Sequence, residues 1–243
     1  KMYGPPAHIV QKGSTSIMDY LRRMDDGDQS GTLTLRDLNL TELPREMLSN
    51  KVFNCLRVYG TTIKALYLDN NKISSIEDTM TIVGAQEDVA KQLSDLRTLS
   101  LANNTLRKVP HVLCNLSSLT SLNLQKNSLI KSLPVEMGNL TSLTELKITI
   151  IVPGGGNQRQ FISPPKEILD LSVEPAEYED GEFVRAGTAG IAVHYLRMIM
   201  DAKTSKRLYH MKMGLRALAP ELVVLAEGEY GLEGQTSFGT EAE

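Results

Sequence analysis

Leucine and other aliphatic residues recur along the chain at a fixed spacing. The pattern L-x-x-L-x-L-x-x-N-x-L begins at Leu96, again at Leu119 and, in shortened form, at Leu143, so the period is 23 and then 24 residues. Earlier copies start near Ile63 and Leu33, and the one at Leu33 lacks the asparagine. Five copies of one short unit predict a repeat architecture, because a single unit is too small to bury its own apolar face.

Within each unit the pattern predicts a short strand, a turn and a helical return segment. The two leucines of L-x-L lie on one face of an extended strand, because side chains alternate along a strand. Asn71, Asn104 and Asn127 follow their strands at the point where the chain must turn. The L-x-x-L-P segments that come next predict a helix or a 3₁₀ turn on the opposite side of the unit.

Three stretches break this period. Residues 44–62 and 77–95 each add about ten residues, and the second has the spacing of a helix, which predicts a longer helix or loop on the convex side. Residues 153–160 are rich in glycine and polar residues, which predicts a surface loop inserted in the last regular coil.

The repeat resembles that of the leucine-rich-repeat family, and the resemblance covers residues 30–152 well. It implies an α/β solenoid with a curved parallel β-sheet on the concave side and short helices, 3₁₀ turns and loops on the convex side. It also implies that the asparagine side chains bond neighbouring backbone and form a ladder along the stack. Such arrays bind other macromolecules, so the resemblance implies an interaction module rather than an enzyme.

A longer repeat spans about 175 residues. Pro5-Pro6, a glycine and Tyr20-Leu21-Arg22 recur downstream as Pro164-Pro165, a glycine and Tyr195-Leu196-Arg197. This element resembles the end of intracellular Ras-group-related leucine-rich-repeat proteins, in which a short helix closes an array. We therefore expect one block of a tandem array with parts of its neighbours. The predicted parts are 1–25, the end and capping helix of a preceding block; 26–170, a block of about five repeats; 171–186, an acidic insertion; 187–205, a second capping helix; and 206–243, the start of a following block.

Composition narrows the class of partner. The net charge is −3 with basic and acidic residues interspersed, which gives no electrostatic reason to expect nucleic acid or a membrane surface as partner. Two cysteines far apart form neither a disulfide framework nor a metal cluster, which favours a reduced, cytoplasmic setting. Four N-x-S/T sequons, which an extracellular protein could glycosylate, arise readily in this repeat, and the cysteine-rich caps of secreted arrays are absent.

Residues 26–37 offer a rival interpretation. Asp26, Asp28, Ser30 and Gly31 fit positions 1, 3, 5 and 6 of an EF-hand loop, and Asp37 stands at position 12, where glutamate is usual. The leucines that follow have strand spacing instead of the spacing of an exiting helix. The sequence favours a turn that begins a repeat, with a calcium-responsive module as the alternative; no other metal site and no cofactor are expected.

The residues between the strand leucines are the candidates for binding. Tyr67 is the best single anchor, because tyrosine and arginine are enriched where binding energy concentrates. The predicted protein-binding residues on the concave face are Thr34, Arg36, Tyr67, Asp69, Ser100, Asn123, Gln125 and Lys147.

Two functions are compatible with this surface. The favoured one is a protein–protein interaction scaffold or adaptor, with a small GTPase or the subunits of a large assembly as candidate partners. The other is the repeat region of a larger signalling enzyme, such as a GTPase–kinase, whose catalytic domains lie outside this chain.

Overall fold

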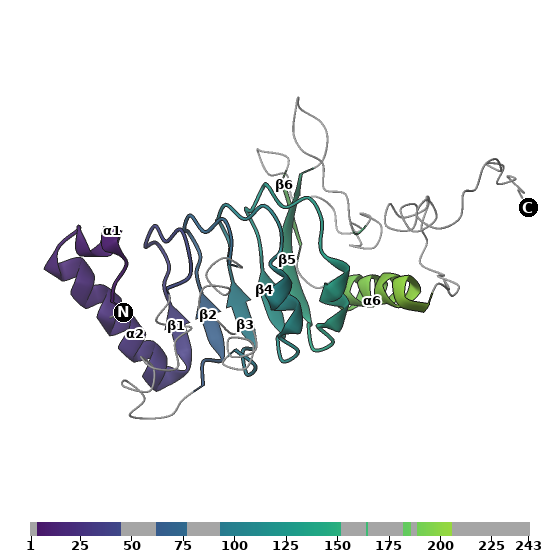
Figure 1. Ribbon diagram of the computed structural model, residues 1–243, viewed down its shortest axis with the longest axis horizontal. Coiled ribbons are helices and arrows are strands. Elements are labelled where there is room, and N and C mark those ends of the chain that lie inside the picture. The colour runs from purple at the N-terminus through teal and green to yellow at the C-terminus, as the bar shows by residue number, and fades with distance from the viewer. Residues whose placement is uncertain are drawn as a thin grey trace, which may run out of the picture.

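The computed structural model of the protein describes residues 4–44, 62–76, 93–151, 164, 182–185 and 189–205. In this part of the chain short strands follow one another along an elongated body, with helices at both ends (Figure 1). In chain order the elements are α1 (Ala7–Val10), α2 (Ser14–Ser30), β1 (Thr32–Thr34), β2 (Ala65–Tyr67), β3 (Thr98–Ser100), the 3₁₀ turn η2 (His111–Asn115), β4 (Ser121–Asn123), the 3₁₀ turn η3 (Val135–Asn139), β5 (Glu145–Ile151), β6 (Glu182–Arg185) and α6 (Ala189–Ser205).

Five parallel strands form the predicted solenoid sheet. Strands β1 to β5 pair in sequence order, and β6 is added antiparallel to β5. The register aligns the central leucine of each strand with that of the next, so one buried row runs through the stack. This row consists of Leu33, Leu66, Leu99, Leu122 and Leu146. The repeat pattern is confirmed: most of its leucines are buried and join successive coils into one core, and Leu38 and Leu129 are half-buried.

A left-handed residue follows each three-residue strand, three positions after its end. Asp37, Asn70, Asn103 and Lys126 each stand four positions after a central leucine, and their φ angles lie between 53° and 61°. Asparagine and aspartate enter this conformation more readily than other non-glycine residues. In the last coil the same position is Ile150, a β-branched residue that strongly disfavours it. Strand β5 accordingly continues to Ile151, and its residues 148–151 pair with β6.

The asparagine after each left-handed residue forms a ladder between coils. Nδ2 of Asn104 donates to the carbonyl oxygens of Leu68, in the preceding coil, and Leu101, in its own coil, at 3.0 Å each. Its Oδ1 accepts the backbone N–H of Ile73 at 3.0 Å. Equivalent bonds are formed by Asn71 and Asn127. The side chains thus satisfy backbone groups that the turns would otherwise bury without partners.

The calcium-loop alternative is contradicted by α2. This helix continues to Ser30 and ends with Gly31 in the left-handed conformation at its C-cap, φ 71°. Asp26 and Ser30 therefore lie on a helix, and Asp28 is buried on its inner side. The glycine that fitted an EF-hand loop is a helix terminator instead. The predicted boundary between residues 25 and 26 also falls inside α2.

The two long helices close the two ends of the described stack (Figure 1). α2 packs on β1, where a Cβ placed on Gly27 would lie 2.8 Å from Cδ1 of Leu33. α6 packs on η3, where a Cβ placed on Gly138 would lie 2.5 Å from the backbone N and Cα of Arg197. In both contacts, therefore, a glycine allows the helix and the neighbouring coil to approach closely.

Several predictions from the sequence concern residues outside the described ranges. These are the period breaks over most of 44–62 and 77–95, the loop at 153–160, residues 171–181 of the acidic insertion and the start of a following block at 206–243. Within the predicted insertion, residues 182–185 form β6, which the sequence pattern did not indicate. The division into tandem blocks stays a prediction.

The asparagine ladder can be tested with a matched pair. Asn104→Ala should lower the free energy of unfolding by about 2–3 kcal/mol, because each buried backbone group left without its partner costs about 1–3 kcal/mol. Asn115→Ala, at an exposed site at the end of η2, should change it by less than about 0.5 kcal/mol. Chemical denaturation followed by circular dichroism measures both, and equal losses would contradict the ladder.

The contact between α6 and η3 gives a second test. Gly138→Ala should loosen the α6–η3 contact by about 1–3 kcal/mol, because the new methyl group meets backbone that cannot move aside. Hydrogen exchange of residues 189–205 should then speed up. Gly190→Ala, where a Cβ would meet nothing within 4 Å, is the control and should leave or improve the protection of α6. Unchanged exchange in Gly138→Ala would refute the close packing.

Candidate functional site: the polar face of the sheet

A cluster of four predicted site residues joins the first three coils. Nε of Arg36 donates to Oδ2 of Asp69 at 2.6 Å, and the guanidinium carbon lies 4.4 Å from the ring centroid of Tyr67. The other carboxylate oxygen, Oδ1 of Asp69, accepts the hydroxyl of Ser100 and, at 3.1 Å, the backbone N–H of Ala102. We call Arg36, Tyr67, Asp69 and Ser100 the arginine–tyrosine cluster.

The members of this cluster have different roles. Asp69 and Ser100 are only 8% and 5% exposed, so they hold neighbouring coils together and offer little surface to a partner. Tyr67 is half-buried and Arg36 is exposed. The Asp69 carboxylate and the Tyr67 ring, over which the guanidinium lies, hold the guanidinium in one orientation, which reduces the side-chain entropy that binding would remove. The binding surface of the cluster is therefore the Arg36–Tyr67 pair.

A second cluster lies at the other end of the face. Nζ of Lys147 donates to Oε1 of Glu145 at 2.7 Å, and the hydroxyl of Ser121 donates to Oε2 at 2.6 Å. The hydrogen bond from Lys147, followed by that from Ser121, lowers the pKa of Glu145 below its ordinary value of 4.5. Glu145 lies between Leu143 and Leu146, where the sequence pattern places residues of the concave face, although it was not one of the eight selected for binding.

The remaining predicted residues lie on the same strands or just beyond them. Thr34 is half-buried in β1, beside Tyr67 in the sheet register. Asn123 ends β4, and its Oδ1 accepts the backbone N–H of Gln125 at 3.1 Å. Both side chains are half-buried. The face thus carries the eight predicted residues, and whether they bind a partner stays a prediction.

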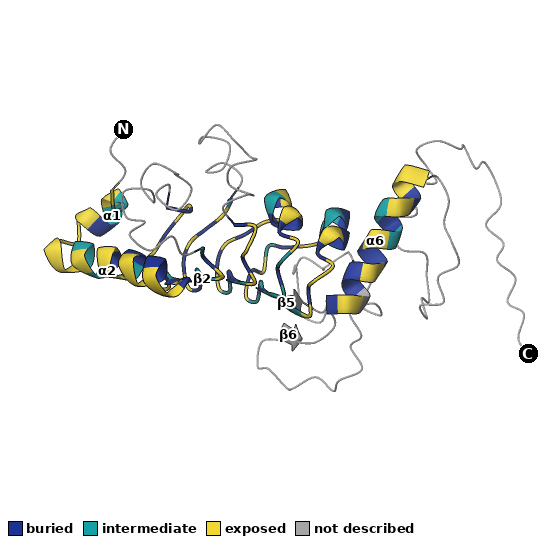
Figure 2. Ribbon diagram, turned by 90° about the horizontal axis from the view of Figure 1, so that it is seen from below, coloured by how far each residue is buried: buried dark blue, intermediate teal, exposed yellow. Residues whose placement is uncertain are grey.

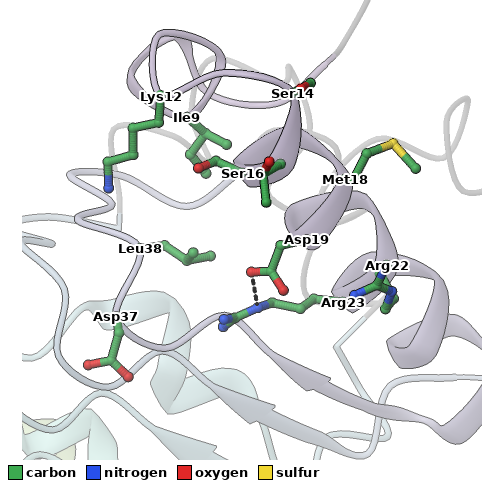
Figure 3. A pocket seen from close by; sticks show the side chains of 11 residues that line it. Ile9, Lys12, Ser14, Ser16, Met18, Asp19, Arg22, Arg23, Asp37 and Leu38 are labelled. Atoms are coloured by element: carbon green, nitrogen blue, oxygen red, sulfur yellow. Dashed lines mark hydrogen bonds and ion pairs between the residues drawn. The ribbon is translucent and has the colours of Figure 1, made fainter.

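Sequence reasoning missed an open hollow of about 700 Å³ between α1, α2 and the turn after β1. Asp19 and Arg23 point into it from α2 and are joined by a 2.9 Å ion pair, with Leu38 and Asp37 across from them (Figure 3). Arg23 also donates to the carbonyl oxygen of Arg36 at 3.0 Å. No separate sequence signal marks this hollow, because it arises where the helix meets the first coil.

Two further searches concern only the part of the chain that the structure describes. In those residues no three or more His, Cys, Asp or Glu side chains come together as a metal site would require. Among the described helices, none combines the length and the apolar character needed to cross a bilayer.

The lowered pKa of Glu145 predicts a pH effect. A carboxyl whose pKa is depressed by folding stabilises the fold above its ordinary pKa, and this contribution is lost as the pH falls through the folded pKa. Lys147→Met should raise the Glu145 pKa toward 4.5 in a carbon-detected NMR titration and remove that acid-sensitive contribution. Lys131→Met is the control, since Lys131 is not among the groups that shift this pKa. An unchanged titration in Lys147→Met would show that the ion pair is absent in solution.

Known proteins resemble this chain in its repeats. Residues 61–129 match the family described as leucine rich repeat. A solved leucine-rich-repeat protein from Leptospira interrogans is 23% identical, with a TM-score of 0.33, over 53% of this chain and 35% of that one. No curated protein is significantly similar in sequence. The matched segment contains β2, β3, β4 and the whole asparagine ladder. The protein therefore carries a leucine-rich-repeat domain, and its described residues have the leucine-rich-repeat fold.

Proposed function

We propose that the chain is a scaffold or adaptor module that binds a partner protein on the polar face of its sheet. Domains of the matched family are typically protein-interaction modules and are usually non-catalytic. The observation that carries the proposal is the Arg36–Tyr67 pair, in which a guanidinium paired with Asp69 lies over an aromatic ring on an otherwise polar surface. Arginine and tyrosine are the residue types that most often dominate binding energy at protein interfaces.

The chemistry of the face suggests the kind of partner. The face presents one cation beside an aromatic ring at one end, an opposed Glu145–Lys147 pair at the other and amides between them. Such a mixed surface suits a folded protein with polar groups of both signs, and it lacks the dense positive charge that a nucleic acid requires. A small GTPase or the subunits of a large assembly remain our candidates, in a cytoplasmic setting.

A photo-crosslinking comparison tests which surface is used. A photoreactive amino acid placed at Asn123, on β4, should capture a partner from the native cell type. The same amino acid at Asn115, on η2, should not, because the 3₁₀ turns lie on the other side of the coils from the strands (Figure 2). Partners are identified by mass spectrometry. Equal capture of the same protein from both positions would remove the polar face as the site.

The affinity for the captured partner gives the second test. Tyr67→Ala should weaken binding about tenfold or more, as expected for truncating an interface anchor. Asn115→Ala should bind as the unaltered protein does. Arg36 is less suitable for this purpose, because its removal also leaves the buried Asp69 carboxylate without its cation. Calorimetric titration measures the affinity, and wild-type binding by Tyr67→Ala would place the anchor elsewhere.

A further inference from the structure

The two capping helices are equivalent residue by residue. α2 comprises Ser14–Ser30 and α6 comprises Ala189–Ser205, so a shift of 175 residues superposes both helix starts and both helix ends. The same shift aligns Tyr20 with Tyr195, and both rings are fully buried. The same structural element is therefore present twice in one chain, once before the described coils and once after them.

In α2 one face is covered by the coil that follows it. Tyr20, Met24 and Gly27 are buried and share this face, since they stand four and three residues apart. Gly27 marks the point where the helix meets Leu33 of β1. This face of α2 corresponds to Tyr195, Ile199 and Ala202 in α6, which are also buried.

In α6 another face is covered by the coil that precedes it. The backbone of Arg197 approaches Gly138 of η3 so closely that no side chain fits between them. Val193 stands four residues before Arg197 and three before Leu196, so it shares one side of the helix with both, and Val193 and Leu196 are only 7% and 0% exposed. The 3₁₀ turn η3, which lies between β4 and β5, is thus the surface against which this face packs.

The equivalent face of α2 is exposed to solvent. Met18 and Leu21 stand where α6 has Val193 and Leu196, and they are 58% and 45% exposed. Arg22 is the same residue type as Arg197 at the position of the glycine contact. Val10 of α1 is the other large apolar residue that the described chain exposes, so all three lie at this end of the stack. Figure 2 shows α2 exposed over much of its length, whereas buried turns recur along α6.

We propose that Met18, Leu21 and Arg22 form the seat for a preceding leucine-rich-repeat coil of the same polypeptide. The occupant presents a 3₁₀ turn like η3, with aliphatic side chains and a glycine at the position of Gly138. α2 is then a joint between two arrays, with one coil on each of two faces, rather than an end cap. The aliphatic face is buried in α6 and exposed in α2. Contact between water and large apolar groups is unfavourable, which favours a coil that covers this face of α2. The proposal is independent of the partner-binding face.

Thiol labelling compares the 243-residue chain with the full-length polypeptide of its native gene. Met18→Cys and Leu21→Cys should react freely in the isolated chain. In the full-length polypeptide they should react about tenfold or more slowly, because a covered side chain reacts only through transient opening. Asp26→Cys is the matched control: it lies on α2 and is exposed, as is its equivalent Asp201 in α6, so it should react equally in both. Peptide-resolved mass spectrometry separates these sites from Cys55 and Cys114.

A second measurement does not depend on the cysteine substitutions, which could themselves alter the structure. The double change Met18→Glu and Leu21→Glu should leave the melting temperature of the isolated chain unchanged and lower that of the full-length polypeptide. Equal labelling of both polypeptides at Met18→Cys and Leu21→Cys would overturn the proposal. Protection in the isolated chain that rises with its concentration would also overturn it, since the occupant would then be a second copy.

Discussion

Stacking between neighbouring coils is the interaction on which this structure depends. A three-residue strand has one central leucine and cannot form a core by itself. Its leucine is buried only because the same position in the coils on either side is also a leucine, in register across the sheet. The energy of the fold is therefore distributed between adjacent coils, and the ends of the stack need helices to cover the last exposed rows.

Polar side chains near the surface also depend on the stacking of neighbouring coils. The asparagine ladder crosses from coil to coil, and so does the arginine–tyrosine cluster, in which Asp69 of one coil bonds Arg36 of the coil before and Ser100 of the coil after. The proposed binding surface is consequently built by stacking and not by any single repeat. A partner that contacts Arg36 and Tyr67 meets side chains whose positions are set by three coils together.

The capping helices show how one element can serve two positions. α2 and α6 have the same length and the same buried tyrosine, yet their surroundings differ because different faces are covered. A helix with two apolar faces suits a place between two arrays better than a place at the end of one. The difference is seen at two equivalent positions, which are exposed in α2 (Met18 and Leu21) and buried in α6 (Val193 and Leu196).

The sequence by itself determined the coils. Each unit repeats the same leucine spacing and the turning asparagine, and this local pattern predicts strand, turn and stacking without knowledge of distant residues. It also indicates which residues lie between the inward-facing leucines, because alternation along an extended segment is a local property. Tertiary structure alone decided which of them are accessible: Asp69 and Ser100 look like surface residues in the pattern and are buried by bonds to other coils. The addition of β6 and the exposed face of α2 were likewise decided by contacts, or missing contacts, between segments far apart in the chain, which no local pattern of residues can encode.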